Sequence, residues 1–196
     1  RMDEKYDFCR SIRVGDWKYI RNYQAIYPDG LQNNYRYINL AWKEWRELFN
    51  TGKLNSAQSA FFLPKPAEQL FLLTKDPHEI NDLSSKVEHR ERLFALRAEL
   101  TKQVKAMPDL SFIPESILVD KAMNNPVAYG QNRKAAIARY VDIANLALLP
   151  AAEAIPRLRE AMESNDSVDR YWAFSVCSIF GEQATELVSA AKRSVA

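Results

Sequence analysis

Two short stretches near the start of the chain alternate between apolar and polar residues. Tyr6, Phe8 and Ile12 share one face of the first stretch, residues 6–13, and the second stretch covers residues 17–23. The loop between them contains Gly15. Such alternation indicates β-strands, and a short glycine loop between two of them is typical of a β-hairpin. A third strand is predicted at residues 69–73, where an apolar stretch of strand length ends before Pro77.

A helical period replaces the alternation in the next part of the chain. Apolar residues recur every three or four positions, which predicts one helical face that ends at Gly52. The residues of this face are Tyr35, Ile38, Trp42, Trp45 and Phe49. Its two tryptophans would suit a stacking platform for sugar rings, but packing in a core is the more common role of such a stripe.

Two further helix starts are predicted after the third strand. Asp76 is expected to cap a helical turn, with Pro77 at its first position. Ser85 and Glu88 have the spacing of a capping box at the start of a long helix. Pro108 ends that helix, whose apolar stripe is formed by Leu93, Leu96, Leu100, Val104 and Met107. We expect the stripe to cover one face of the small antiparallel sheet, which gives an α+β fold.

The pattern becomes entirely helical after Pro126. Prolines interrupt residues 108–130, where one short helix is predicted at 115–123. Four helices are then expected at residues 131–149, 152–162, 168–180 and 185–195, separated by turn residues. We therefore predict an α+β domain at residues 1–126 and an all-α extension at residues 127–196.

The charge of the chain is nearly balanced. It has 27 basic and 25 acidic residues, for a net charge of +2. This balance gives no long-range field that would attract nucleic acid or an anionic membrane, so neither is expected as a partner. No apolar stretch approaches the roughly 20 residues that a membrane-spanning helix needs.

Candidate catalytic and metal-binding residues are few. Cys9 and Cys177 are too far apart for a disulfide framework or a metal site, and we expect both to be buried thiols. His78 and His89 have no neighbouring cysteines, so no zinc site is predicted. Asp76 and the nearby Glu79 are better explained as helix-capping residues than as a catalytic pair of carboxylates. Phosphate-binding glycine motifs are absent, and residues 17–21 lack the signature of RNA-binding strands.

Four stretches in the first 126 residues resemble the C-terminal portion of arylsulfatase-type sulfatases, of the alkaline-phosphatase-like superfamily. Residues 10–23, RSIRVGDWKYIRNY, are similar to the hairpin R-x-V-R-x-G-x-Y-K-Y-I, and residues 1–7 resemble the segment that precedes it. Residues 52–66 are similar to G-K-L-x-x-A-Q-x-A-F-W-x-x-K-P. Residues 69–83 are similar to E-L-Y-D-L-x-x-D-P-x-E-x-x-N-L. The more apolar third strand of this chain predicts that Leu72 is buried.

This resemblance implies a parent enzyme that hydrolyses sulfate esters. Its nucleophile would be a formylglycine made within C/S-x-P-x-R, and a calcium ion would lie nearby, both in a large N-terminal domain of the same parent chain. The nearest match here, residues 9–13, has Ser11 in place of the obligatory proline. The resemblance therefore implies that this segment has no catalytic residue, no metal and no cofactor of its own, that it is a fragment, and that its parent is periplasmic or secreted.

In such sulfatases the loop after the hairpin lies near the mouth of the active site. Here that loop is residues 22–36. Arg21 and Arg36 are candidate ligands for a sulfated substrate, with Asn34 and Tyr35 as neutral hydrogen-bonding neighbours. A plain surface role for these four residues stays open.

The helical extension resembles a different family. Residues 155–162 and 166–173 are similar to the two helices of a HEAT repeat. Because stacked repeats need neighbours or a polar cap, we expect the natural chain to continue past Ala196. The alternative function is thus a non-enzymatic helical-repeat module that binds a protein partner.

Overall fold

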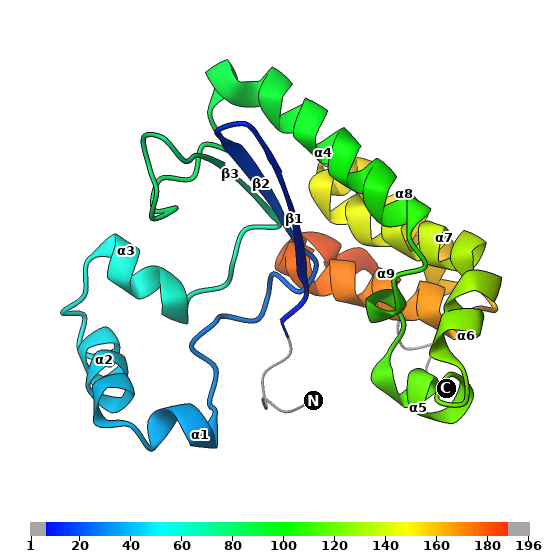
Figure 1. The fold of residues 1–196 in the computed structure, drawn as a ribbon, viewed down its shortest axis with the longest axis horizontal. Helices are drawn as coiled ribbons and strands as arrows, with labels where there is room; N and C mark the ends of the chain where they lie inside the picture. Colours follow the sequence, from blue (N-terminus) through cyan, green and yellow to red (C-terminus); the bar gives the residue numbers. More distant parts are fainter. Residues whose placement is uncertain (1–6, 188–196) are drawn as a thin grey trace. The chain divides into compact units, whose positions relative to one another are not determined.

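The computed structural model describes residues 7–187 and divides the chain into two compact units, Arg1–Val87 and Glu88–Ala196 (Figure 1). The motif at residues 1–7 lies almost wholly outside the described residues, as does most of the helix predicted at 185–195. The α+β class is confirmed, because a three-stranded antiparallel sheet is combined with helices. The domain boundary after Pro126 stays a prediction.

The sheet of the first unit has the predicted strands. They are β1 (Cys9–Val14), β2 (Trp17–Asn22) and β3 (Glu68–Leu72), in the order β1-β2-β3. Val14 pairs with Trp17, so the hairpin loop is only Gly15 and Asp16. Gly15 has φ +60, a conformation that glycine adopts without steric cost.

Strand β3 is covered on both faces. Leu70 pairs with Tyr19 and is buried, and the next residue, Phe71, is buried as well. Since neighbouring side chains of a strand point to opposite faces, both faces are packed. Leu72 is half-buried rather than buried, because it lies at the end of the strand opposite Trp17.

The predicted helical face at residues 35–49 is divided between two helices, α1 (Asn34–Tyr37) and α2 (Leu40–Asn50). Asn39 separates them, and its side chain accepts a hydrogen bond from the Ala41 amide at the start of α2. This break changes the phase of the pattern. Tyr35 and Ile38 are therefore exposed, at 92% and 74%, contrary to the prediction, and Tyr37 is buried.

The end of α2 is as predicted. Gly52 has φ +67, its amide donates to the Phe49 carbonyl at 3.0 Å, and the Lys53 amide donates to Leu48 at 2.9 Å. These two bonds form a Schellman motif, for which glycine is the preferred residue.

An aromatic cluster joins α2 to the segment that follows it, which comprises α3 (Ser56–Ser59) and the 3-10 turn η1 (Ala60–Phe62). Trp45 stacks on Phe61 with ring centroids 4.6 Å apart, and the cluster also contains Trp42, Phe49 and Phe62. The two tryptophans pack against other rings, but both are only half-buried.

The helix start predicted at Asp76 is wrong. Asp76 is buried, and its carboxylate accepts from the Ile80 and Asn81 amides at 3.1 and 2.7 Å. These amides follow it by four and five positions, so the two bonds close a loop. Glu79 has φ +55 in this loop and pairs with Lys18 at 2.6 Å. The expected capping box is also displaced, because the long helix begins only at Arg90, after the 3-10 turn η2 (Val87–His89).

The regular elements described in the second unit are all helices. Its helices are α4 (Arg90–Ala106), α5 (Glu115–Lys121), α6 (Pro126–Asn132), α7 (Lys134–Ala144), α8 (Ala151–Met162) and α9 (Ser167–Phe180). Three 3-10 segments connect or follow them: η3 (Leu110–Phe112), η4 (Asn145–Leu148) and η5 (Gly181–Leu187). Helix α9 packs against α7 and α8, and α4 packs against α7.

Most of the predicted stripe of α4 is confirmed. Leu93, Leu96, Leu100 and Val104 are buried, whereas Met107 is 45% exposed because the helix ends before it. Helices α8 and α9 agree with the prediction to within one residue. The long helix predicted at 131–149 is instead divided among α6, α7 and η4.

Candidate functional site

Arg21 has a structural environment. It lies in β2, is 2% exposed, and donates from Nη1 to the carbonyls of Asn22 and Ala67 at 2.6 and 2.9 Å. Its guanidinium also lies 4.6 Å from the centre of the Tyr23 ring. These contacts bind the end of β2 to the residues that lead into β3, and they leave the guanidinium inaccessible to a substrate.

The other three predicted residues lie together on α1. Arg36 Nη1 donates to the Asp29 carbonyl at 2.6 Å, and its guanidinium lies 5.1 and 5.3 Å from the Trp42 and Phe61 ring centres. In the described part of the chain, its other N–H groups have no protein acceptor. Arg36 is thus a cation held in place by one carbonyl and two rings, with donors left for an anion. Tyr35 beside it is almost fully exposed.

Two further residues belong to this group but were missed in the sequence. Arg46 donates to Gln32 Oε1 at 2.6 Å and lies 3.9 Å from the Tyr37 ring centre, and Gln32 in turn donates to Asn34 at 3.4 Å. Arg46 follows Trp42 by four positions on α2. Its partners, however, are Gln32 and Tyr37, so no local spacing on α2 identifies it.

A cavity of about 420 Å³ lies beside this group. It is lined by Asp29, Ser56, Ala60, Phe61, Leu63, Pro64, Lys65, Pro66 and Gln69. Lys65 Nζ pairs with Asp7 at 2.6 Å and with Asp29 at 3.3 Å. Burial disfavours the ammonium, but the hydrogen bond to Asp7 and the charges of Asp29 and Asp7 outweigh it, so the pKa of Lys65 is raised. Lys65 is therefore charged at neutral pH.

Gly30 anchors the segment that carries the cavity residue Asp29. Its amide donates to the Phe61 carbonyl at 2.7 Å, and the Tyr37 hydroxyl donates to the Gly30 carbonyl at 2.7 Å. A Cβ at Gly30 would clash with Cδ1 of the Phe62 ring. The segment that carries Asp29 is thus held against η1 by one hydrogen bond and a close approach that only glycine permits, and against α1 by the bond from Tyr37.

We expect Gly30→Ala to destabilise the first unit by about 1–3 kcal/mol, the usual cost of forcing extra volume into a packed site. The backbone of Gly30 is not in the left-handed region, so the cost is steric. Hydrogen exchange of the β2 and β3 amides would measure it. The double variant Gly30→Ala/Phe62→Leu is the control, because removing the ring should recover part of the stability that Gly30→Ala loses. If the two substitutions destabilise the unit additively, the Phe62 ring does not clash with the new Cβ.

Neither cysteine has the properties of a nucleophile. Cys9 is exposed, contrary to prediction, and Cys177 is half-buried. Protein atoms packed around the sulfur and the Asp7 carboxylate raise the pKa of Cys9, and burial raises that of Cys177 to about 11. Both are therefore protonated at neutral pH. Within residues 7–187, no three His, Cys, Asp or Glu side chains are grouped to hold a metal ion.

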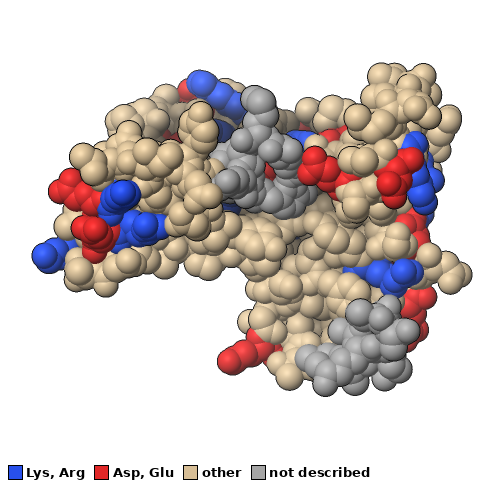
Figure 2. All heavy atoms as spheres, turned by 90° about the horizontal axis from the view of Figure 1, so that it is seen from below, with Lys and Arg blue, Asp and Glu red and all other residues tan. Residues whose placement is uncertain are grey.

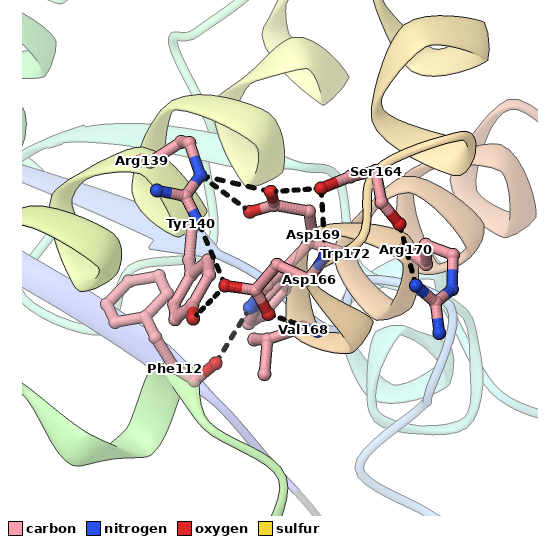
Figure 3. Close-up of polar contacts among 9 residues, drawn as sticks. All are labelled: Phe112, Arg139, Tyr140, Ser164, Asp166, Val168, Asp169, Arg170 and Trp172. Atoms are coloured by element: carbon pink, nitrogen blue, oxygen red, sulfur yellow. Dashed lines mark hydrogen bonds and ion pairs between the residues drawn. The ribbon is translucent and has the colours of Figure 1, made fainter. Parts of the chain in front are cut away.

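A second polar cluster lies in the helical unit (Figure 3). Arg139 on α7 donates from Nε to both carboxylate oxygens of Asp169, at 2.9 and 3.0 Å, and from Nη2 to Asp166 at 2.8 Å. Asp166 also accepts from the Tyr140 hydroxyl at 2.7 Å, and Asp169 accepts from Ser164 at 2.7 Å. The cluster joins α7 to the turn between α8 and α9.

The electrostatics of this cluster are those of a structural network. Burial disfavours the Asp166 carboxylate, but hydrogen bonds from Tyr140 and the Val168 amide, together with Arg139, lower the pKa of Asp166. Burial and the bond to Asp166 raise the pKa of Tyr140, and the bond to Asp169 raises that of Arg139. Every shift favours the protonation state already present at neutral pH, so the cluster fixes the α8–α9 turn.

We expect Asp166→Asn to destabilise the helical unit by about 1 kcal/mol at neutral pH, because Asn keeps the helix cap but loses the charge beside Arg139. Since the folded-state pKa of Asp166 is lowered, its contribution is present above the ordinary Asp pKa and is lost as the pH falls through the folded value. Hydrogen exchange of α9 at several pH values checks this. The exposed pair Lys105–Asp142 provides the control Asp142→Asn, which should change stability by less than about 0.5 kcal/mol.

The surface has no extended field of one sign on the face shown in Figure 2, where basic and acidic side chains lie in small groups separated by uncharged areas. Among residues 7–187, no helix has both the length and the apolar character needed to cross a membrane.

Comparison with known proteins gives one informative relationship. The chain is 36% identical over 125 residues to an ulvan-active sulfatase of Formosa agariphila. The match covers 63% of this chain and 21% of the relative, so the chain spans about a fifth of the length of that sulfatase. No family model and no solved structure matches the chain. The relationship supports the resemblance to a segment of a larger sulfatase.

Proposed function

We propose that the chain is the C-terminal segment of a sulfatase whose parent hydrolyses sulfate esters. The observation that carries this proposal is the 36% identity to an ulvan-active sulfatase over 125 residues. The larger part of that relative lies outside the match, which leaves room for a separate catalytic domain. By this proposal the parent acts on sulfate esters of the ulvan type and is periplasmic or secreted.

The segment itself has structural and substrate-edge roles in this proposal. Calcium and formylglycine belong to the N-terminal domain of the parent, which is the partner of this segment. The substitution of Ser11 for the required proline and the raised pKa of Cys9 both support a segment without a nucleophile of its own. Its contribution to the reaction is to position the substrate.

In this proposal the substrate edge comprises Asn34, Tyr35 and Arg36, together with Arg46, whose partner Gln32 also contacts Asn34. Arg36 is the residue best placed to hold a sulfate or carboxylate group, because its remaining N–H donors lie on an immobilised guanidinium. Arg21 is outside this edge because its side chain is buried.

In the full-length parent, Arg36→Ala should raise KM for a sulfated saccharide about ten-fold, the loss expected for one charge-assisted hydrogen bond, with little change in kcat. Arg36→Lys should recover only part of the affinity, because Lys lacks the planar fork. Lys43→Ala removes an exposed charge from α2 and is the matched control. A kcat loss without a KM change would contradict a substrate-edge role.

The sequence encoded upstream of residue 1 tests the proposed function directly. A C/S-x-P-x-R motif some hundreds of residues earlier is expected, because that motif supplies the formylglycine. A start codon close to residue 1 with no such motif would overturn the sulfatase assignment.

One observation favours the alternative, a HEAT-like module that binds a protein partner. A groove of about 530 Å³ runs along α7, η4 and α8, with an apolar floor of Ile143, Leu146 and Ala161. Charged side chains, among them Arg139 and Arg157, line its sides. Such a groove between paired helices suits the partner-binding face of a helical repeat.

A further inference from the structure

The cavity beside Asp29 combines apolar and hydrogen-bonding groups in one wall. The Phe61 ring, Pro64 and Pro66 supply apolar surface, and Leu63 and Ala60 are exposed residues of its lining. Asp29, Ser56, Lys65 and Gln69 supply the polar groups. Its volume of about 420 Å³ is within the range of about 300–1,000 Å³ usual for small-molecule sites.

Two of the polar groups have hydrogen-bonding capacity that the protein does not use. The Ser56 hydroxyl has no hydrogen-bond partner among the residues that the structure describes. Gln69 accepts from Asn22 through Oε1 at 2.9 Å, but its amide N–H groups have no acceptor in the same residues. The cavity thus offers a hydroxyl and an amide donor, in addition to the Asp29 carboxylate, to a ligand.

The local charge decides which ligand suits these groups. The Lys65 ammonium is already paired with Asp7 and Asp29, so its charge is offset by these two carboxylates. A sulfate or carboxylate inside the cavity would lie beside the Asp29 carboxylate, which disfavours it, because Asp29 belongs to the lining and Arg36 does not. Uncharged hydroxyl groups, in contrast, can donate to a carboxylate and accept from Gln69 and Lys65.

We propose that this cavity binds one uncharged sugar ring. Sugar hydroxyls match the carboxylate, amide and hydroxyl groups, and the C–H face of the ring matches the Phe61 edge and the prolines. The cavity is largely formed before a ligand binds, because the Gly30 amide donates a hydrogen bond to the Phe61 carbonyl and the Lys65 amide donates to the Ala25 carbonyl at 2.8 Å.

The cavity is also coupled to the substrate edge. Arg36 donates to the Asp29 carbonyl and lies over Phe61, and both of these residues line the cavity. A saccharide that places an anionic group at Arg36 can therefore place a neutral ring beside Asp29. This role in the substrate rests on the proposed function, whereas binding of the sugar does not.

Binding is tested on the complete 196-residue chain by NMR titration with methyl glycosides of neutral pentoses, hexoses and 6-deoxyhexoses. Methyl glucuronide and glucose 6-sulfate serve as anionic probes. Ala60→Trp should fill the cavity from an exposed position, and Ala57→Trp places the same ring on α3 at a residue outside the lining. Asp29→Asn removes the charge with little change of shape, and unchanged amide spectra establish that each variant is folded.

We expect saturable binding of at least one neutral glycoside with a Kd in the millimolar range, as for a small ligand in an open site. Ala60→Trp should abolish it, Ala57→Trp should retain it, and Asp29→Asn should weaken it about ten-fold. No saturable binding, equal binding by Ala60→Trp, or tighter binding of the anionic probes would overturn the inference. Because turnover is not measured, these outcomes leave the sulfatase assignment unaffected.

Discussion

Trp172→Ala should destabilise the helical unit by about 3–5 kcal/mol, the usual cost of deleting a large buried aromatic side chain. Trp172 is fully buried on α9, and its ring lies 5.5 Å from that of Phe112. Its indole N–H donates to the Phe112 carbonyl at 2.8 Å (Figure 3). The substitution therefore removes both the packing and the hydrogen bond that connect α9 to η3.

Two variants separate these contributions. Trp172→Phe keeps an aromatic ring but loses the donor, so we expect a smaller loss of about 1–3 kcal/mol. Ser178→Ala changes an exposed position of the same helix and should alter stability by no more than about 0.5 kcal/mol. Chemical denaturation followed by helical circular dichroism measures all three. Equal stability of Trp172→Ala and the natural chain would contradict the packing described for α9.

Arg21→Ala should have the largest effect in the first unit, about 2–4 kcal/mol, because it removes a buried side chain, its hydrogen bonds to the Asn22 and Ala67 carbonyls and its stack on Tyr23. The Asn22 amide donates to the Ala67 carbonyl at 2.9 Å, so faster hydrogen exchange at this amide measures the loss of stability where β2 meets the residues that lead into β3.

The control for Arg21 is Arg13→Ala, since Arg13 is exposed on β1 and, among residues 7–187, donates to the nearby Gly15 carbonyl alone. It should change stability by less than about 0.5 kcal/mol. Arg21→Lys should be intermediate, because Lys keeps the charge without the planar fork. If Arg21 were solely a substrate ligand, Arg21→Ala would leave the exchange rates unchanged.

The elements that were predicted correctly from the sequence are those determined by residues close together in the chain. The hairpin follows from Gly15 between two alternating stretches, and the start of α9 follows from Asp166 as its cap. The predictions were wrong where a residue type is compatible with more than one local structure. Asp76 has the residue type of a helix cap, yet its carboxylate accepts from amides four and five residues later and closes a loop. Asn39 separates α1 from α2 and caps α2, so the residues before and after it do not share one helical face.

The candidate site depended on contacts between distant parts of the chain. Asn34, Tyr35 and Arg36 are adjacent in sequence, so their grouping was predictable. The burial of Arg21 depends on Ala67, which is 46 residues later, and the place of Arg46 depends on Gln32, 14 residues earlier. The Arg139 network spans 27 and 30 residues. Hydrophobic periodicity does not encode such pairings, since each is set by tertiary packing.

The most direct test of the account is turnover of an aryl sulfate by the 196-residue chain, with the full-length parent assayed beside it. Because the nucleophile and the calcium ion are proposed to lie in the N-terminal domain, we expect turnover by the full-length enzyme and none above a buffer blank by the chain alone. Turnover by the chain alone, abolished by a substitution within it, would contradict the account.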